Sequence, residues 1–86
     1  MKKIIGVLRP FDLKQNFYVY EDGNKIDAIA VSIDEINNAI FNFQNKYNLT
    51  DVELIGPKQY AKGIKNKILE EEKNKYNKNN LRIDII

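Results

Sequence analysis

The side chains that could do chemistry in this chain are carboxylates, lysines and tyrosines, because the sequence contains neither histidine nor cysteine. Serine and cysteine triads, thiolate metal sites and most general-base schemes are therefore excluded. The carboxylates form no recognisable pair or metal-binding constellation. Their only run is Glu70-Glu71-Glu72, which is typical of a solvated helix face. We expect a protein that is not an enzyme and that uses no metal or cofactor.

One strand-to-helix turn could bind an anion. Gly56-Pro57 precedes Lys58, Lys62 and Lys65, which share one side of a helix predicted to begin at Pro57. Free N–H groups at a helix start attract anions. Lysines near that start oppose the helix dipole, and a bound phosphate would account for them. The alternative is a lysine-rich solubilising surface, because the turn lacks a phosphate-binding consensus.

Tyrosines on a predicted hairpin form a second candidate site. Residues 16–21 are aromatic and β-branched, Asp22-Gly23 is a strong hairpin signal, and residues 24–31 supply the partner strand. A two-residue turn would pair Tyr20 with Lys25 and Tyr18 with Asp27. This register predicts one apolar face and one polar face. The apolar face would carry Phe17, Val19, Ile26 and Ala28, and the polar face Tyr18, Tyr20, Lys25 and Asp27.

The remaining segments complete a predicted α/β fold. Residues 3–8 are an apolar run typical of a central strand, and residues 51–55 and 81–86 favour two more strands. Ser32-Ile33-Asp34-Glu35 predicts a capping box. An apolar stripe follows and predicts a helix that ends near Asn48. The whole chain, residues 1–86, is expected to be one domain with the order β-β-β-α-β-α-β and a mixed five-stranded sheet.

The predicted topology leaves one face of the sheet uncovered. Right-handed crossovers would place both helices on the same face. Tyr18, Tyr20, Lys25 and Asp27 would then project from the other face, and Arg82 and Asp84 would join them from the last strand. Tyrosine and arginine are enriched in interface hot spots, whereas the acids argue against RNA. The alternative is an ordinary solvated face.

Much of the chain resembles the ribonuclease H-like and actin-like superfamily. "IIGVLRPFDLKQNFYVYEDGNKIDAIAV" is similar to its first three strands, and "VELIGPKQYAKGIKNKI" to its later strand, turn and helix. The resemblance implies ribonuclease H-like topology. Active members carry an acid on the first strand, where this chain has Val7, Leu8 and Arg9. A stiff Arg9-Pro10-Phe11 replaces the glycine-rich phosphate loop of the ATPases, which implies a catalytically degenerate, minimal core.

The opening "MKKIIGVLRPFDLKQ" is also similar to the start of PII signalling proteins. In that family a long helix follows Arg-Pro-Phe. Here the predicted hairpin follows, so we reject this second resemblance.

Composition narrows the expected function. A net charge of +2 over 86 residues is too small to indicate nucleic acid or a membrane surface as the partner. No signal peptide or spanning run is evident, which predicts a cytoplasmic protein. Abundant Ile, Lys and Asn suggest a phage or low-GC bacterium as the source. We expect a protein that binds a macromolecular partner or itself through the exposed sheet face, such as a phage or mobile-element inhibitor or adaptor. The alternative is a nucleotide- or phosphate-binding domain that uses residues 56–62.

Overall fold

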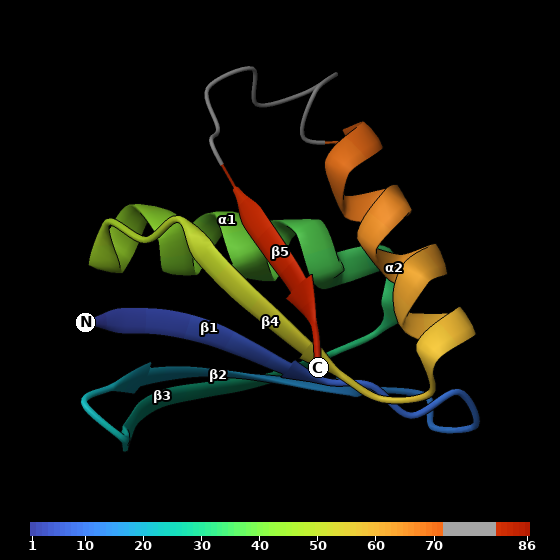
Figure 1. The fold of residues 1–86 in the computed structure, drawn as a ribbon, viewed down its shortest axis with the longest axis horizontal. Coiled ribbons are helices and arrows are strands. Elements are labelled where there is room, and N and C mark those ends of the chain that lie inside the picture. Colours follow the sequence, from blue (N-terminus) through green and yellow to red (C-terminus); the bar gives the residue numbers. More distant parts are fainter. Residues whose placement is uncertain (72–80) are drawn as a thin grey trace.

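Strands and helices follow the predicted order in the computed structural model, which describes residues 1–71 and 81–86 (Figure 1). A hairpin of β2 and β3 follows β1, and a short 3-10 turn at Ile33–Glu35 leads into α1. The bounds are β1 Lys2–Val7, β2 Gln15–Glu21, β3 Asn24–Val31, α1 Ile36–Tyr47, β4 Asp51–Ile55, α2 Lys58–Glu71 and β5 Arg82–Ile85.

The strands form one mixed five-stranded sheet with the spatial order β3-β2-β1-β4-β5. β2 pairs antiparallel with both β1 and β3, whereas β4 pairs parallel with both β1 and β5. β1 therefore lies at the centre of the sheet, between the hairpin and the two parallel strands. This is the strand order of a ribonuclease H-like fold, and it confirms the predicted fold class.

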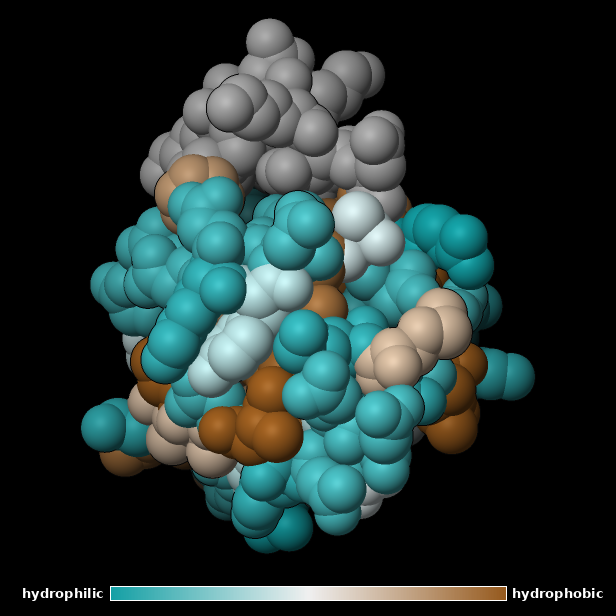
Figure 2. Space-filling view, turned by 90° about the vertical axis from the view of Figure 1, so that its left-hand side faces the viewer, coloured by the Kyte–Doolittle hydropathy of each residue, from teal (hydrophilic) through white to brown (hydrophobic). Residues whose placement is uncertain are grey.

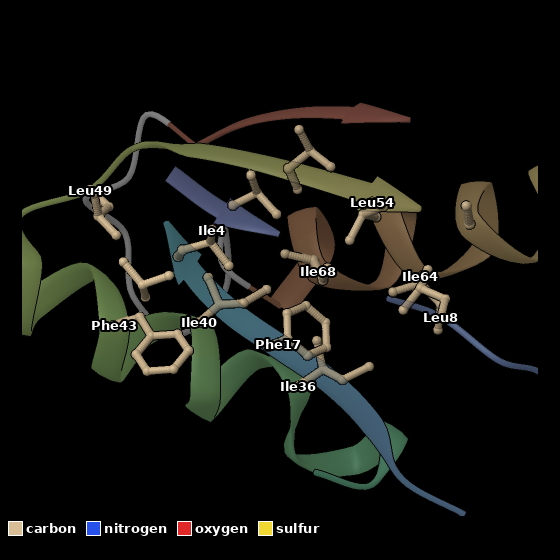
Figure 3. Packing of buried hydrophobic residues seen from close by; sticks show 14 residues of the cluster. Ile4, Leu8, Phe17, Ile36, Ile40, Phe43, Leu49, Leu54, Ile64 and Ile68 are labelled. Atoms are coloured by element: carbon tan, nitrogen blue, oxygen red, sulfur yellow. The ribbon is translucent and has the colours of Figure 1, made fainter. Parts of the chain in front are cut away.

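Both helices cover the same face of the sheet, as predicted. Ile36, Ile40 and Phe43 of α1 and Ile64 and Ile68 of α2 belong to a single buried cluster with the strands. Figure 3 shows these side chains meeting those of the sheet. The strand residues in the cluster include Ile4, Phe17, Val19, Val52, Leu54 and Ile83. Among the described elements, no helix covers the opposite face, which we call the open face.

The centre of the core depends on a glycine in β1. Gly6 lies opposite Phe17 in the antiparallel ladder. A Cβ atom at Gly6 would overlap Cε2 of Phe17 and would lie 3.0 Å from Cδ2 of Leu54. The fully buried ring of Phe17 thus occupies the space that a side chain at Gly6 would need.

The start of the first helix differs from its prediction. Ser32 makes no side-chain cap, and its carbonyl instead accepts the Glu35 backbone N–H at 3.0 Å, which closes a 3-10 turn. The Glu35 carboxylate accepts a bond from Asn38 Nδ2 at 2.9 Å. The predicted capping box is therefore wrong. The predicted helix end is confirmed, because Asn48 has the left-handed conformation, with φ 58°.

Gly6 and Gly63 provide a matched test of the packing. We expect Gly6→Ala to lower the free energy of unfolding by about 1–3 kcal/mol, because the added methyl group overpacks the core. Gly63 lies within α2, and a Cβ there would meet nothing within 4 Å. Gly63→Ala should raise the free energy of unfolding by roughly 0.5–1 kcal/mol. Urea denaturation of both variants checks this, and a neutral Gly6→Ala would contradict the packing described.

Candidate functional site

The open face carries three rows of side chains that run across the strands. Their order follows from the paired registers of the five strands. The first row holds Lys25, Tyr20, Lys3, Asp51 and Arg82. The second holds Ala28, Tyr18, Ile5, Glu53 and Asp84. The third holds Ala30, Asn16, Val7 and Ile55. The first row is thus rich in charge and the third is largely apolar.

The tyrosines predicted for this face contact each other and a lysine. The rings of Tyr18 and Tyr20 meet edge to face, with their centroids 6.3 Å apart. Lys25 lies opposite Tyr20, but its ammonium lies 4.9 Å from the centroid of the Tyr18 ring. This cation–π contact positions the positive charge over the second row.

Asp27 does not lie on the open face, and the predicted hairpin register is wrong beyond Lys25. A β-bulge leaves Ile26 without a partner, so Asp27 pairs with Val19 and Ala28 with Tyr18. Because side chains alternate along a strand, one inserted residue transfers Asp27 to the helix-covered side. There its carboxylate meets α1.

Asp27 accepts bonds from three donors. The Tyr47 hydroxyl donates to Oδ2 at 2.6 Å, Lys46 Nζ donates to the same oxygen at 3.2 Å, and the Ala28 N–H donates to Oδ1 at 2.8 Å. These three bonds lower the pKa of Asp27, and the bond from Tyr47 has the largest effect. The same contact raises the pKa of Tyr47, and the Asp27 carboxylate also raises the pKa of Lys46. We interpret these contacts as a structural link that holds β3 against α1.

Ion pairs cross the half of the open face formed by β1, β4 and β5. Lys3 Nζ lies 3.1 Å from Glu53 Oε2, and Arg82 Nε lies 3.5 Å from Asp51 Oδ1. Asp84, in the same half, has no ionic partner among residues 1–71 and 81–86. The half therefore carries one carboxylate that no neighbouring cation neutralises.

A hollow of about 570 Å³ joins this half to the hairpin. Its lining includes Tyr20, Arg82 and Asp84, so candidates predicted from separate segments meet at one place. Within the described part of the chain, no three acidic side chains are grouped so that they could hold a metal ion. Figure 2 views the end of the molecule with the N-terminus and hairpin turn, where the surface is mainly hydrophilic with separate apolar spots. Most residues that line the hollow are charged, so it offers ionic contacts beside apolar surface from Ile5 and Tyr20.

The three lysines of the candidate anion site lie on α2, and Gly56, which precedes this helix, has a packing role. A Cβ at Gly56 would lie 2.8 Å from the carbonyl oxygen of Leu8, because β1 and β4 lie close together there. Lys58 and Lys62 are exposed and Lys65 is half-buried, and none of the three has an acidic partner in the described ranges. The first turn of α2 contains no acid. Of the acidic run, Glu72 lies outside the described residues.

Gln15, which holds the loop after β1, was not singled out by the sequence. The Arg9 N–H donates to Gln15 Oε1 at 2.6 Å, and Gln15 Nε2 donates to the carbonyls of Arg9 and Asp12 at 2.9 and 3.1 Å. Gln15 is fully buried, whereas the side chains of Phe11 and Leu13 are 99% and 92% exposed. The clamped loop thus presents two apolar side chains to solvent, and the isolated Pro10 was the only sequence signal of its rigidity.

The chain matches no protein-family model, and no curated protein or solved structure is significantly similar to it. Within the described residues, no helix is long and apolar enough to cross a membrane. Inferences about function therefore depend on the geometry of the open face and of α2.

The Asp27 cluster predicts a defined pH dependence of stability. The folded-state pKa of Asp27 lies below its ordinary value of 3.8, so its contribution is present above pH 3.8 and is lost as pH falls through the lowered pKa. The pKa of Tyr47 lies above its ordinary value of 10.0, so its contribution is present below pH 10.0 and is lost as pH rises through the raised pKa.

We therefore expect Asp27→Asn to lower the melting temperature most between about pH 5 and pH 9. The difference from the unsubstituted protein should shrink at both extremes. Asp12→Asn, at an exposed loop carboxylate, is the control and should change little. Thermal melts followed by circular dichroism measure this, and a difference that does not vary with pH would refute the assigned electrostatics.

Proposed function

We propose that this chain is a non-catalytic binding protein that engages a protein partner, a second copy included, through its open face. The observation that supports this most strongly is a five-stranded sheet covered by helices on one side, with Tyr18 and Tyr20 on the other. Solvated sheet faces are common, but tyrosine is among the residues that dominate binding energy at interfaces.

The tyrosines make contacts within the chain that restrain their side chains. Tyr18 contacts the ring of Tyr20 and the ammonium of Lys25. Side chains held in this way lose less rotational freedom on binding, so more of their contact energy appears as affinity. The ion-paired strands beside them offer polar contacts that would orient a partner.

A degenerate relation to the ribonuclease H-like and actin-like superfamily is part of the proposal. Its support is the strand order, together with apolar and basic residues at the end of β1 where active members carry an acid. A binding surface of this kind suits an adaptor or inhibitor, which needs contact but no chemistry.

Substituting both tyrosines tests the proposed surface. We expect the double variant Tyr18→Lys, Tyr20→Lys to fold and to lose its partners, because two flexible charges replace the ordered rings. Asn42→Lys with Asn45→Lys is the matched control, since both asparagines are exposed on α1 and the charge change is the same. Affinity capture with quantitative mass spectrometry, together with sedimentation velocity, compares the proteins. An unchanged partner set and sedimentation profile would refute the proposal.

A nucleotide- or phosphate-binding domain is the second candidate, and the charge pattern of α2 favours it. Its first turn contains no acid, and Lys58 and Lys62 are exposed near the helix start. If the site binds anions, millimolar ATP or inorganic phosphate should raise the melting temperature, and Lys58→Glu should remove the rise. Sodium chloride at equal ionic strength is the control. The absence of any shift with either anion would rule this candidate out.

A further inference from the structure

We infer that the occupant of the open face is a second copy of this chain, related by a two-fold axis that runs along β1. This inference rests on the proposed function and makes it specific. An isologous contact requires a surface that is complementary to itself. The two halves of the open face on either side of β1 meet this requirement.

The halves differ in charge. Within the described residues, the half formed by β2 and β3 carries Lys25 and no acid, because the bulge moves Asp27 to the other side. The half formed by β4 and β5 carries Asp51, Glu53 and Asp84 against a single cation, Arg82. Lys3 lies on the central strand and pairs with Glu53. A two-fold axis along β1 therefore superposes a cationic half on an anionic half.

The rows bring the unpaired charges together. This axis sets each row of one copy on the same row of the other, with β3 over β5. Lys25 extends its ammonium over the ring of Tyr18 in the second row, where it would face the neighbouring carboxylates Glu53 and Asp84 of the opposing copy. Neither Lys25 nor Asp84 forms an ion pair within residues 1–71 and 81–86, so each is available to the other. The two-fold axis makes this Lys25–Asp84 contact occur twice in the dimer.

The centre of the contact would be apolar. Ile5 and Val7 project from β1 on the axis, and each would meet its own copy. Ile55 lies beside Val7 in the neighbouring strand and extends the apolar region. Tyr18 would lie opposite Glu53, where its hydroxyl can donate to the carboxylate.

The size of the face sets the expected strength. Strands about 4.8 Å apart and residues about 3.3 Å apart give an open face of roughly 24 by 20 Å, which fits within the molecular extents of 30 × 29 × 20 Å. Two such faces bury roughly 1,000 Å², near the lower limit for specific interfaces. We therefore expect a reversible dimer with a dissociation constant in the micromolar range, roughly 1–100 μM.

Charge reversal tests both the partner and the register. Lys25→Glu alone places like charges opposite each other twice per dimer, and so does Asp84→Lys alone. Each variant should weaken dimerisation by at least about tenfold in sedimentation equilibrium. An equimolar mixture of the two variants should form a heterodimer, because both contacts are then attractive. The double variant Lys25→Glu, Asp84→Lys should dimerise like the unsubstituted protein.

Lys14→Glu is the control, since Lys14 is exposed in the loop before β2 and lies outside the three rows. It should leave dimerisation unchanged. Circular dichroism confirms folding of every variant. If neither the mixture nor the double variant restores dimerisation, the proposed alignment of the two copies is wrong.

A chain that stays monomeric up to about 1 mM would overturn self-association, since the expected dissociation constant lies well below that concentration. That result would leave the proposed function to be decided by the tyrosine variant. Loss of captured partners in that variant would then support a different protein at this face.

Discussion

The packing of Phe17 against the bare backbone of Gly6 is the contact on which the two faces of this sheet depend. It sets the register of β2 on β1, and with it the partner of every other residue in the two strands. Because side chains alternate along a strand, burying Phe17 and Val19 necessarily directs Tyr18 and Tyr20 to the open face. The candidate site is thus a geometric consequence of the core.

Most of the fold could be predicted because its signals are local. Asp22-Gly23 forms the expected turn, with φ values of 51° and 83°, and the alternation around β5 correctly placed Arg82 and Asp84. Asp27 could not be placed from the sequence, since its position depends on a bulge and on Tyr47, a residue distant in the chain. The role of Gln15 could not be predicted from the sequence either. Its buried amide donates to carbonyl groups of the loop, and no periodic sequence pattern indicates such bonds.

The bulge changes the character of the open face as well as the position of one residue. With a regular register, Lys25 and Asp27 would lie near each other on that face and neutralise one another. The inserted Ile26 transfers the carboxylate to α1 and leaves the lysine against Tyr18. A local irregularity in one strand thereby separates positive from negative charge across the sheet, which makes one half complementary to the other.

Backbone N–H groups in the loop after β1 donate hydrogen bonds within the protein. A phosphate-binding loop needs backbone N–H groups that point at the ligand and have no partner in the protein. Here the Leu8 N–H donates to the carbonyl of Ile55, the Arg9 N–H to Gln15, and the Asp12 N–H to the carbonyl of Arg9. These groups are therefore occupied within the protein. The loop exposes the apolar side chains of Phe11 and Leu13 to solvent. These side chains are better suited to contact with a protein surface than to binding an anion.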